Sequence, residues 1–568
     1  MQNRLWVFGA ILGGTCAALL GFSTLLDAAP DELAKEFANA VPKTTKTARP
    51  KLGVVIVFDQ LRGDYLIKWK DLFVEGGFKR LQTEGAWFTD CHYPYSDTVT
   101  AAGHTSLLTG CTPRDHGIIG NSWYERGSGK RVQSVSGLIG PDPMRRRRAT
   151  LGDALMEQTH GKAKVASLSI KDRAAILMAA LRAQLVYWLS AEDQFETSRH
   201  YAPTVKPWVD DFNKAGKIQA YFGRPWNRLR DRLDYQRFSG PDNFKFEGSG
   251  YDQGQTFPHP TPHASAVECS PFGNEVLLDF AKTAIEKEAL GRGDVPDLLC
   301  LSFSSNDLIG HSFGPDSQEV LDVTLRSDLI VKELLDFLDA KIGKGNYFVA
   351  LSADHGICPL PEAARQQGKV SARVLNTLLS TQAQAFLQKT FAPGKAKVEW
   401  IEATSSSWVY LDQAVIAEQG LEPGVVETAL ADWLMKQSGV ERAYTRSQLS
   451  SKEPLADAVA EQVRQSFHPD RSGDVTAILK PYHFLWGTTT IKGGGSSCTT
   501  HGSPHAYDTH VPLLVFGPGI NAGIYTGRVA PQALTPIVAR GLGIRPPATA
   551  TFTVPDGLFK STAAVNVP

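Results

Sequence analysis

Short runs of apolar and β-branched residues recur along the chain, and within each run hydrophobic positions follow one another without regular polar alternation. The runs lie at residues 52–58, 164–169, 298–303, 347–352 and 511–516. Strands that are buried on both faces of a parallel sheet have this continuous pattern. Between the runs lie stretches with helical spacing, of which residues 318–342 are the clearest. The alternation predicts an α/β fold, doubly wound, with a largely parallel sheet and helices on both faces.

Two segments interrupt this alternation. Residues 190–270 are rich in Trp, Arg, Asp, Gly and Pro and show little periodicity, so we interpret them as an insertion. Residues 371–470 have the pattern of a separate α+β unit, with strands expected at 398–402 and 408–411 and a helix at 425–436. We therefore expect an α/β core from residues 50–370 and 471–568, with an insertion at 190–270 and an inserted cap subdomain at 371–470. Both inserted segments are expected to border the functional site.

The N-terminus has the pattern of a targeting segment. Residues 1–4 carry one positive charge, residues 5–26 carry none and are rich in Gly, Ala and Leu, and Asp27-Ala28-Ala29-Pro30 offers small residues for cleavage. This pattern predicts a signal peptide over residues 1–29 and a periplasmic or secreted protein. The apolar run also exceeds the about 20 residues that cross a bilayer, so an uncleaved membrane anchor is the alternative.

Composition narrows the functional classes. The chain has 568 residues, of which 42% are hydrophobic, which suffices for a large buried core. Lys and Arg together number 59, as do Asp and Glu, and this balance argues against nucleic-acid binding through a basic surface. A small anionic substrate needs only a few cationic side chains in the binding site, so the charge balance does not exclude an enzyme that acts on such a substrate.

Cysteine usage argues against a thiolate zinc site. Six cysteines follow the predicted signal peptide, and they form no Cys-x-x-Cys pair: Cys91, Cys111, Cys269, Cys300, Cys358 and Cys498. In an oxidising compartment one or two disulfides could form, and buried free thiols are the alternative.

Acidic and imidazole side chains follow the predicted strands. They are Asp59, Asp307, His311, Asp354 and His355, together with His501 in the segment Thr-Thr-His-Gly. Carboxylate oxygens and imidazole nitrogens without thiolates suit catalytic zinc. The four-residue spacing of Asp307 and His311 places both on one side of a helical turn. Six such residues at the ends of strands can hold two cations.

A threonine-rich segment offers a nucleophile. Residues 97–106 place Thr100 directly before a stretch of small residues. If a helix begins after Thr100, its free N–H groups and positive dipole end face an incoming phosphate. A threonine hydroxyl is a weak nucleophile at neutral pH, and coordination to zinc would lower its pKa. The alternative is that the threonines here only cap a helix.

The motifs around Thr100 resemble a known family. Residues 100–110 read Thr-Ala-Ala-Gly-His-Thr-Ser-Leu-Leu-Thr-Gly, and Pro113, His116-Gly117-Ile118 and Gly120-Asn121 follow. The chain resembles the alkaline phosphatase superfamily, in particular the phosphate-irrepressible, PafA-type alkaline phosphatases, and more distantly the nucleotide pyrophosphatase/phosphodiesterases. The resemblance covers residues 52–121, 171–173, 306–360 and 498–519.

This resemblance implies a catalytic centre with two zinc ions. Thr100 would be the nucleophile, since it stands four residues before His104 as in the family pattern. One zinc ion would be held by Asp307, His311 and His501. The other would be held by Asp59, Asp354 and His355, with Thr100 completing the site. His505 competes with His501, which we prefer because it occupies the His-Gly position of the family.

The resemblance also implies residues that bind the substrate. Lys171-Asp172-Arg173 matches a Lys-x-Arg motif that contacts the non-bridging phosphate oxygens in PafA-type enzymes, and Asn121 matches the asparagine that does the same. Two cations and an amide favour the more highly charged phosphate monoester. We therefore expect a two-zinc alkaline phosphatase that acts on small phosphate esters through a phosphothreonine at Thr100.

Three other functions share part of this pattern. A phosphodiesterase or nucleotide pyrophosphatase on the same bimetal core is the main alternative. A sulfatase needs Cys or Ser in a Cys/Ser-x-Pro-x-Arg motif, and Cys111-Thr-Pro-Arg114 is one residue short and lies downstream of the nucleophile. A non-catalytic, metal-stabilised binding protein would have no need of the hydroxyl and the anion-binding residues together.

Overall fold

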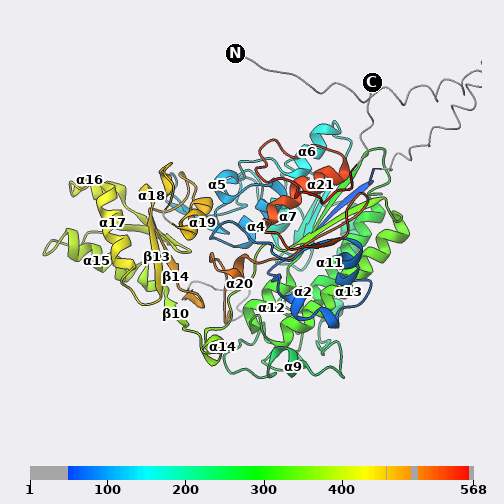
Figure 1. The fold of residues 1–568 in the computed structure, drawn as a ribbon, viewed down its shortest axis with the longest axis horizontal. Coiled ribbons are helices and arrows are strands. Elements are labelled where there is room, and N and C mark those ends of the chain that lie inside the picture. Colours follow the sequence, from blue (N-terminus) through cyan, green and yellow to red (C-terminus); the bar gives the residue numbers. More distant parts are fainter. Residues whose placement is uncertain (1–48, 456, 488–496, 562–568) are drawn as a thin grey trace, which may run out of the picture. The chain divides into compact units, whose positions relative to one another are not determined.

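A nine-stranded sheet forms the centre of the computed structural model, which describes residues 49–455, 457–487 and 497–561 (Figure 1). In spatial order its strands are β17 (Gly523–Tyr525), β2 (Ala86–Phe88), β16 (Leu513–Phe516), β9 (Tyr347–Ser352), β1 (Leu52–Phe58), β8 (Asp297–Phe303), β5 (Val165–Ser169), β6 (Leu185–Leu189) and β7 (Phe195–Glu196). Strands β9, β1, β8, β5 and β6 pair in parallel. Strand β16 runs antiparallel to β9 and β2, and β7 runs antiparallel to β6. The prediction of a largely parallel sheet is confirmed.

The five apolar runs all become strands of this sheet. Every residue of β1, β5, β8 and β9 is buried, which explains why these runs are apolar without alternation. The run at 511–516 begins its strand only at Leu513. Pro512 has no N–H to give to a ladder, so the regular pairing starts after it.

Helices cover both faces of the sheet (Figure 1). One face carries α4 (Thr100–Thr109), α6 (Leu151–Gln158), α7 (Asp172–Met178) and α21 (Leu534–Leu542). The other carries α3 (Phe78–Glu84), α11 (Pro271–Lys287), α12 (Ser305–Phe313) and α13 (Gln318–Lys341). The doubly wound arrangement is therefore confirmed, and the predicted helix at 318–342 is α13.

Shorter elements connect these layers. The predicted insertion at 190–270 contains β7 and the helices α8 (Pro207–Lys214), α9 (Tyr235–Ser239) and α10 (Ala264–Glu268), with the 3₁₀ turn η2 (Gln219–Tyr221). Elsewhere lie α2 (Tyr65–Lys68), α5 (Pro113–His116), α14 (Pro361–Gln366), α20 (Ala506–Thr509), and the turns η1 (Lys70–Leu72) and η4 (Pro531–Ala533). A hairpin of β3 (Ser122–Glu125) and β4 (Lys130–Gln133) follows α5.

A second sheet lies mostly within residues 371–470, and we keep the name cap for this sheet and the elements packed around it. Its strands, all antiparallel, are β11 (Ile401–Ser405), β12 (Trp408–Leu411), β14 (Val475–Leu479) and β13 (Val440–Thr445). Around it lie η3 (Asn376–Leu378), α15 (Thr381–Phe391), α16 (Gln413–Glu418), α17 (Pro423–Leu434), α18 (Arg446–Ser450), α19 (Ala458–Ser466) and the parallel pair β10 (Ala372–Leu375) and β15 (His483–Trp486). An apolar cluster that includes Trp400, Leu430 and Val475 fills its interior.

Two details of the cap differ from the sequence-based expectation. The strand expected at 398–402 begins at Ile401 instead, because the N–H groups of Val398 and Trp400 donate to the side chains of Gln388 and Gln384. The cap sheet also takes in β14, which lies past residue 470, where we expected the cap to end.

The six cysteines are all buried and free, so their apolar surroundings, rather than disulfides, explain their positions. The predicted signal peptide at residues 1–29 lies outside the described residues. Within the described part of the chain, no helix is both long enough and apolar enough to span a bilayer.

Candidate metal centre and active site

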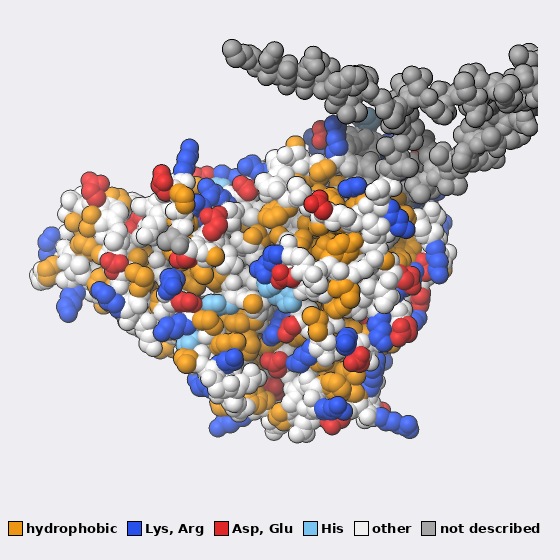
Figure 2. Space-filling view, in the orientation of Figure 1, with side chains coloured by type: hydrophobic (Ala, Val, Ile, Leu, Met, Phe, Trp, Pro, Cys, Tyr) orange, Lys and Arg blue, Asp and Glu red, His pale blue; other side chains and the backbone are white. Residues whose placement is uncertain are grey.

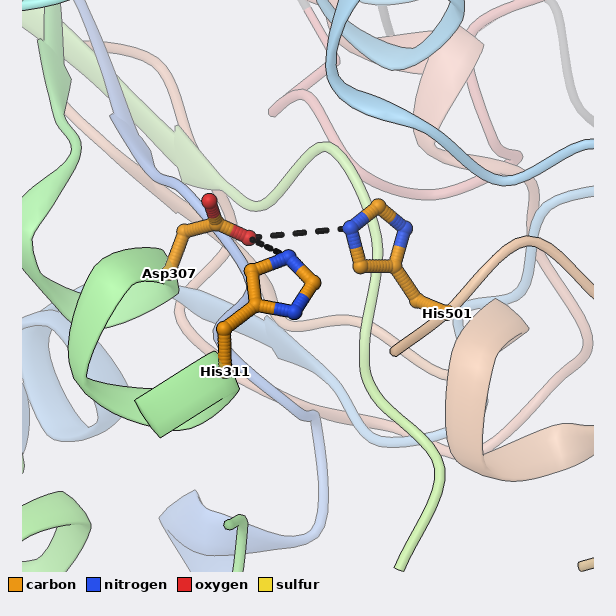
Figure 3. Close-up of side chains that lie close together, drawn as sticks. All are labelled: Asp307, His311 and His501. Carbon is orange, nitrogen blue, oxygen red and sulfur yellow. Dashed lines mark ion pairs between the residues drawn. The ribbon is translucent and has the colours of Figure 1, made fainter. Parts of the chain in front are cut away.

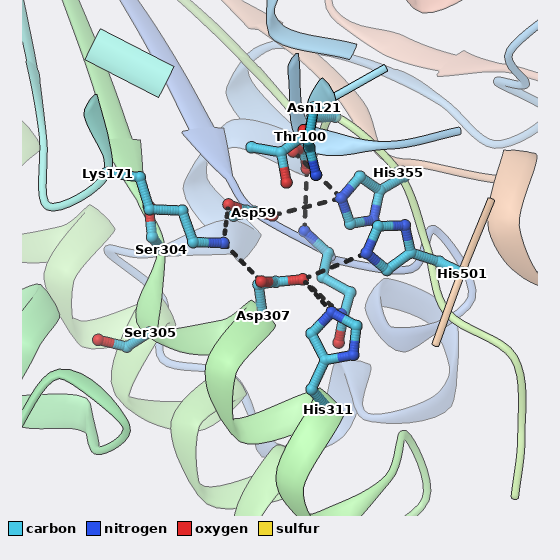
Figure 4. Close-up of polar contacts among 12 residues, drawn as sticks. Asp59, Thr100, Asn121, Lys171, Ser304, Ser305, Asp307, His311, His355 and His501 are labelled. Atoms are coloured by element: carbon cyan, nitrogen blue, oxygen red, sulfur yellow. Dashed lines mark hydrogen bonds and ion pairs between the residues drawn. The ribbon is translucent and has the colours of Figure 1, made fainter. Parts of the chain in front are cut away.

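The predicted site residues meet at one edge of the central sheet. Strand β1 ends before Asp59, β8 leads into the helix that carries Asp307, and β9 leads to Asp354 and His355. Strand β5 leads to Lys171 at the start of α7. Because these four strands are parallel neighbours, their carboxyl ends meet, and Figure 4 shows the side chains of Asp59, Lys171, Asp307 and His355 close together there.

A first group consists of Asp307, His311 and His501 (Figure 3). Asp307 and His311 lie one turn apart in α12, and His311 Nε2 is 3.3 Å from Asp307 Oδ1. His501 comes from a loop almost 200 residues further along the chain, and its Nε2 is 3.7 Å from the same oxygen. The family resemblance implied that these three residues share one metal ion, and their ligand atoms lie within 4.8 Å of one another.

A second group surrounds His355. Its Nε2 is 3.5 Å from Asp59 Oδ1 and 3.3 Å from Asp354 Oδ2, and all three side chains are fully buried. Ligand atoms of Asp59, His355 and Asp307 also lie within 4.8 Å of one another, so the two groups adjoin. The rings of His355 and His501 stack with centroids 3.6 Å apart. The site thus has two adjacent places where oxygen and nitrogen donors converge.

Each of the three imidazoles is fixed in one tautomer. Each Nδ1 atom lies 2.7–2.9 Å from a backbone carbonyl oxygen, which can only accept a hydrogen bond. His311 donates to Thr499, His355 to Gly356 and His501 to Thr98. Nδ1 therefore carries the proton in every case, and Nε2 is left with a free lone pair. All three Nε2 atoms face the carboxylates, which is the arrangement of metal-binding histidines.

Electrostatics at the site favour a bound cation. Burial raises the pKa of Asp59 well above its usual value, and the neighbouring charges of Asp307 and Asp354 raise it further. Burial alone would also raise the pKa of Asp307, but the ammonium of Lys171 and the ring of His311 outweigh it and hold the pKa well below the usual range. One lysine thus compensates three buried carboxylates only in part.

Asp59 Oδ1 and His355 Nε2 are buried at the site and have no hydrogen-bond partner among the described residues. Burial and the neighbouring imidazoles lower the pKa of His501 well below its usual value, so its ring stays neutral. An unpaired carboxyl oxygen beside imidazole nitrogens with free lone pairs fits divalent metal ions with nitrogen and oxygen ligands. The described residues therefore hold candidate sites for two metal ions.

Thr100 and Asn121 lie next to this centre (Figure 4). Thr100 is the first residue of α4 rather than the residue before it, so the helix begins one position earlier than predicted. It is 1% exposed. The next N–H of the helix, that of Ala101, donates to Asn121 Oδ1 at 2.9 Å. This bond fixes which end of the Asn121 amide faces α4 and leaves its NH₂ group able to donate to a further partner.

Lys171 and Arg173 occupy different places. Lys171 Nζ lies 2.7 Å from Asp59 Oδ2 and 2.5 Å from Asp307 Oδ2, so it bridges the two groups of ligands. These carboxylates raise the pKa of Lys171 despite its burial. Arg173 is close enough to Lys171 to oppose that shift, and its guanidinium has a contact of 3.8 Å with Asp172. Two cationic side chains therefore lie on the β5 side of the centre.

His505, the competitor of His501, lies elsewhere. Its Nε2 pairs with the carbonyl oxygen of Leu479 in the cap at 2.8 Å. The structure therefore brings His501, and not His505, to the carboxylates.

Comparisons with known proteins agree with this geometry. Residues 53–506 match the family model described as type I phosphodiesterase / nucleotide pyrophosphatase. The chain belongs to this family. Alkaline phosphatase PafA of Elizabethkingia meningoseptica is 33% identical over 506 residues, covering 85% of this chain and 89% of that protein. Alkaline phosphatase PhoV of Synechococcus elongatus is 32% identical over 549 residues, covering 93% and 96%.

A solved structure also matches this chain over most of its length. The crystal structure of wild-type alkaline phosphatase PafA superposes with a TM-score of 0.82, at 33% identity, and covers 92% of this chain and all of that one. The resemblance stated from the motifs is thus confirmed, as is the enzyme class, a hydrolase of the alkaline phosphatase type.

Two residues that contact the carboxylates of the candidate metal centre were not predicted from the sequence. Gln60 has a left-handed backbone, with φ of 70°, which turns its N–H toward Asp354 Oδ1 at 3.0 Å and its side-chain amide toward Asp307 Oδ1 at 2.6 Å. His104 Nδ1 lies 2.8 Å from the Thr100 carbonyl and 3.2 Å from Asp354 Oδ2. The position directly after a strand-end aspartate was the only sequence signal for Gln60.

Proposed function

We propose that the protein is a two-zinc phosphomonoesterase that forms a phosphothreonine at Thr100. The observation that carries this proposal is the convergence of three Nε2 atoms and three buried carboxylates beside the first residue of a helix. A phosphate group that meets Thr100 there would also face the N-terminal end of α4, whose N–H groups favour anions.

The residues divide into two metal-binding sets. Asp307, His311 and His501 would hold one zinc ion, and Asp59, Asp354 and His355 the other, with Thr100 completing the second set. Zinc suits a donor set of nitrogen and oxygen without thiolates. When bound, the two ions would supply Lewis-acid stabilisation of the negative charge that develops on the reacting oxygens.

The protein's own residues would then carry out two displacements. Thr100 Oγ1 attacks phosphorus, the ester P–O bond breaks, and the leaving alcohol takes up the proton that the threonine loses. A water molecule next attacks the phosphothreonine, the bond from phosphorus to Thr100 Oγ1 breaks, Thr100 Oγ1 takes up a proton from that water, and inorganic phosphate leaves. Buried Thr100 is held in place by the first turn of α4, so little motion is needed for the attack.

Three further side chains would set the substrate class. The Asn121 amide donates to one non-bridging oxygen, and Lys171 and Arg173 supply positive charge on the opposite side. A monoester dianion carries more charge on these oxygens than a diester does, so these contacts favour the monoester. Each charge-assisted hydrogen bond is worth about 1.5–3 kcal/mol, or roughly 10- to 150-fold in rate when it strengthens in the transition state.

The competing function is phosphodiester hydrolysis on the same centre, since the family model includes phosphodiesterases. Rates with p-nitrophenyl phosphate and bis(p-nitrophenyl) phosphate, measured on the zinc-loaded protein, separate the two. We expect the monoester to react faster by orders of magnitude. A strong preference for the diester would establish the alternative.

The nucleophile is tested by Thr100→Ala. Phosphatase activity should fall by orders of magnitude while metal analysis still finds two zinc ions per chain. Thr105→Ala is the matched control, because Thr105 lies in the same helix and its hydroxyl bonds to Ala101 O within it. Full activity of Thr100→Ala would remove the assignment.

The N-terminal segment supports an extracytoplasmic location. We propose a periplasmic or secreted enzyme in which residues 1–29 act as a signal peptide, with an uncleaved membrane anchor as the alternative. N-terminal sequencing of the protein recovered from the periplasmic fraction and from membranes distinguishes a chain that begins near residue 30 from one that retains residue 1.

A further inference from the structure

The β3–β4 hairpin fixes the backbone of Asn121. Asn121 directly precedes β3, and its carbonyl oxygen accepts from the N–H of Ser134, which closes the base of the hairpin at 2.9 Å. Its side chain is tied to α4 through Ala101. Any tilt of the hairpin would therefore move Asn121 relative to Thr100.

This hairpin is too small to hold its own position. It has two strands of four residues, and β4 is mostly exposed. An isolated two-stranded hairpin is at best marginally stable in water. Its orientation therefore depends on what it packs against, which is the core on one side and the cap on the other.

The core side holds the hairpin through Trp123. This ring is buried in the main core cluster, with the guanidinium group of Arg145 5.7 Å from its centroid. Arg145 also bonds to Glu125 at 2.6 Å. These contacts keep the hairpin attached when cap contacts are lost, so a cap-side substitution should shift it rather than unfold it.

On the cap side, strand β11 lies against the hairpin. Ser405 Oγ donates to the Ser122 carbonyl, one residue from Asn121, at 3.2 Å. Arg131 donates to the Thr404 carbonyl at 2.7 Å. The contacts run along the length of the hairpin, from its base to its second strand.

Arg126, at the hairpin turn, makes the strongest set of these contacts. It donates to Asp474 Oδ2 at 2.5 Å, to Glu402 Oε2 at 2.7 Å and to the Leu411 carbonyl at 3.1 Å. Its guanidinium also lies 5.2 Å from the ring centroid of Tyr410. The Asp474 side chain is 2% exposed, so this ion pair is screened from water on one side and holds more firmly than an exposed pair.

We propose that Arg126 is a positioning residue for Asn121, and that through it the cap sets how well the active site binds the phosphate monoester. The inference rests on the proposed function, in which Asn121 donates to a non-bridging oxygen. When Arg126 holds the hairpin on the cap, the amide stays aimed beside Thr100. Without Arg126, the hairpin leans about Trp123, and the amide loses its alignment.

A double-mutant cycle tests this coupling in the zinc-loaded full chain. Asn121→Ala should lower kcat/KM for p-nitrophenyl phosphate by about 10- to 100-fold. Arg126→Ala alone should lower it about 10-fold, because small misplacements of a binding group are costly. In the Asn121→Ala background, Arg126→Ala should change it less than about 2-fold, because residues that act through one another are not additive.

A matched control separates positioning from general damage to the cap. Arg446 approaches the same Asp474, at 3.9 Å, but does so from within the cap. Arg446→Ala should leave kcat/KM close to that of the wild type. Arg126→Lys, which keeps one of the ion pairs, should recover part of the lost rate.

The outcomes are distinct. Equal losses from Arg126→Ala with and without Asn121 would overturn the positioning role while leaving the proposed function standing. The same loss from Arg446→Ala would also overturn it, since cap stability alone would then explain the effect. An Asn121→Ala variant with full activity would instead refute the role of Asn121 in the proposed function, and the inference with it.

Discussion

Asp97 should make the stability of the protein decrease as the pH rises. Its carboxyl lies three residues before Thr100, is 5% exposed, and has Trp408 Nε1 of the cap as a donor at 3.1 Å. Burial raises the pKa of Asp97 from 3.8 to about 7. The hydrogen bond from Trp408 lowers this pKa, but by less than burial raises it. A charged Asp97 is therefore unfavourable in the folded protein.

The direction and size of this pH effect on the free energy of unfolding follow from the difference in the pKa of Asp97 between the folded and unfolded states. Below about pH 4 the carboxyl is neutral in the folded and unfolded states, and it costs nothing. Between pH 4 and 7 it is charged only in the unfolded chain, so folding takes up a proton and stability falls as the pH rises. Above pH 7 it is charged in both states, and the cost is complete. About three pK units correspond to roughly 4 kcal/mol.

Asp97→Asn isolates this cost, because the amide oxygen can still accept from Trp408. Melting temperatures of variant and wild type should be compared at a series of pH values from about 4.5 to 8.5, at one zinc concentration. Taking the difference at each pH cancels the pH dependence of metal binding. The variant should gain several degrees relative to the wild type toward alkaline pH. A difference that stays constant with pH, or that grows in favour of the wild type, would refute the reasoning.

Three further predictions concern the metal centre. Gln60→Ala should weaken zinc binding about 10- to 100-fold, measured by competition with a chelator, because its amide orients a ligand carboxylate; unchanged affinity would show that Gln60 only fills space. His501→Ala should lose one zinc ion per chain by metal analysis, whereas His505→Ala should keep two, and the reverse pattern would exchange their roles. Lys171→Ala should lower kcat/KM for a monoester about 10- to 150-fold, and for a diester less; equal losses would show that it serves only the metal-binding carboxylates.

Much of the central sheet was predictable because burial leaves a strong mark on sequence. Strands with both faces covered are mostly apolar on both faces, so β1, β8 and β9 stand out as runs without regular polar alternation. The first polar residue after such a strand then falls at the ligand-binding edge, which is why Asp59 and Asp354 could be proposed at once.

Other features depend on contacts between distant segments and left no local pattern. Gln60 has a positive φ, lies against Gly310 and bonds to two carboxylates, one from α12 and one from the segment after β9, and no propensity predicts this arrangement. The Nδ1 partners of the histidines are backbone carbonyls, which any residue supplies. The start of the cap strand that begins at Ile401 was predicted too early, because two glutamine side chains accept hydrogen bonds from N–H groups that precede the strand.

Direct capture of the phosphorylated enzyme tests the central claim, that Thr100 reacts beside a pair of metal ions. The zinc-loaded protein is mixed with a phosphate monoester, quenched in acid within one turnover and digested for mass spectrometry. We expect one phosphoryl group on the peptide that contains Thr100, and none there in Thr100→Ala. Phosphate on another residue, or rapid turnover with no phosphorylated peptide, would contradict the account.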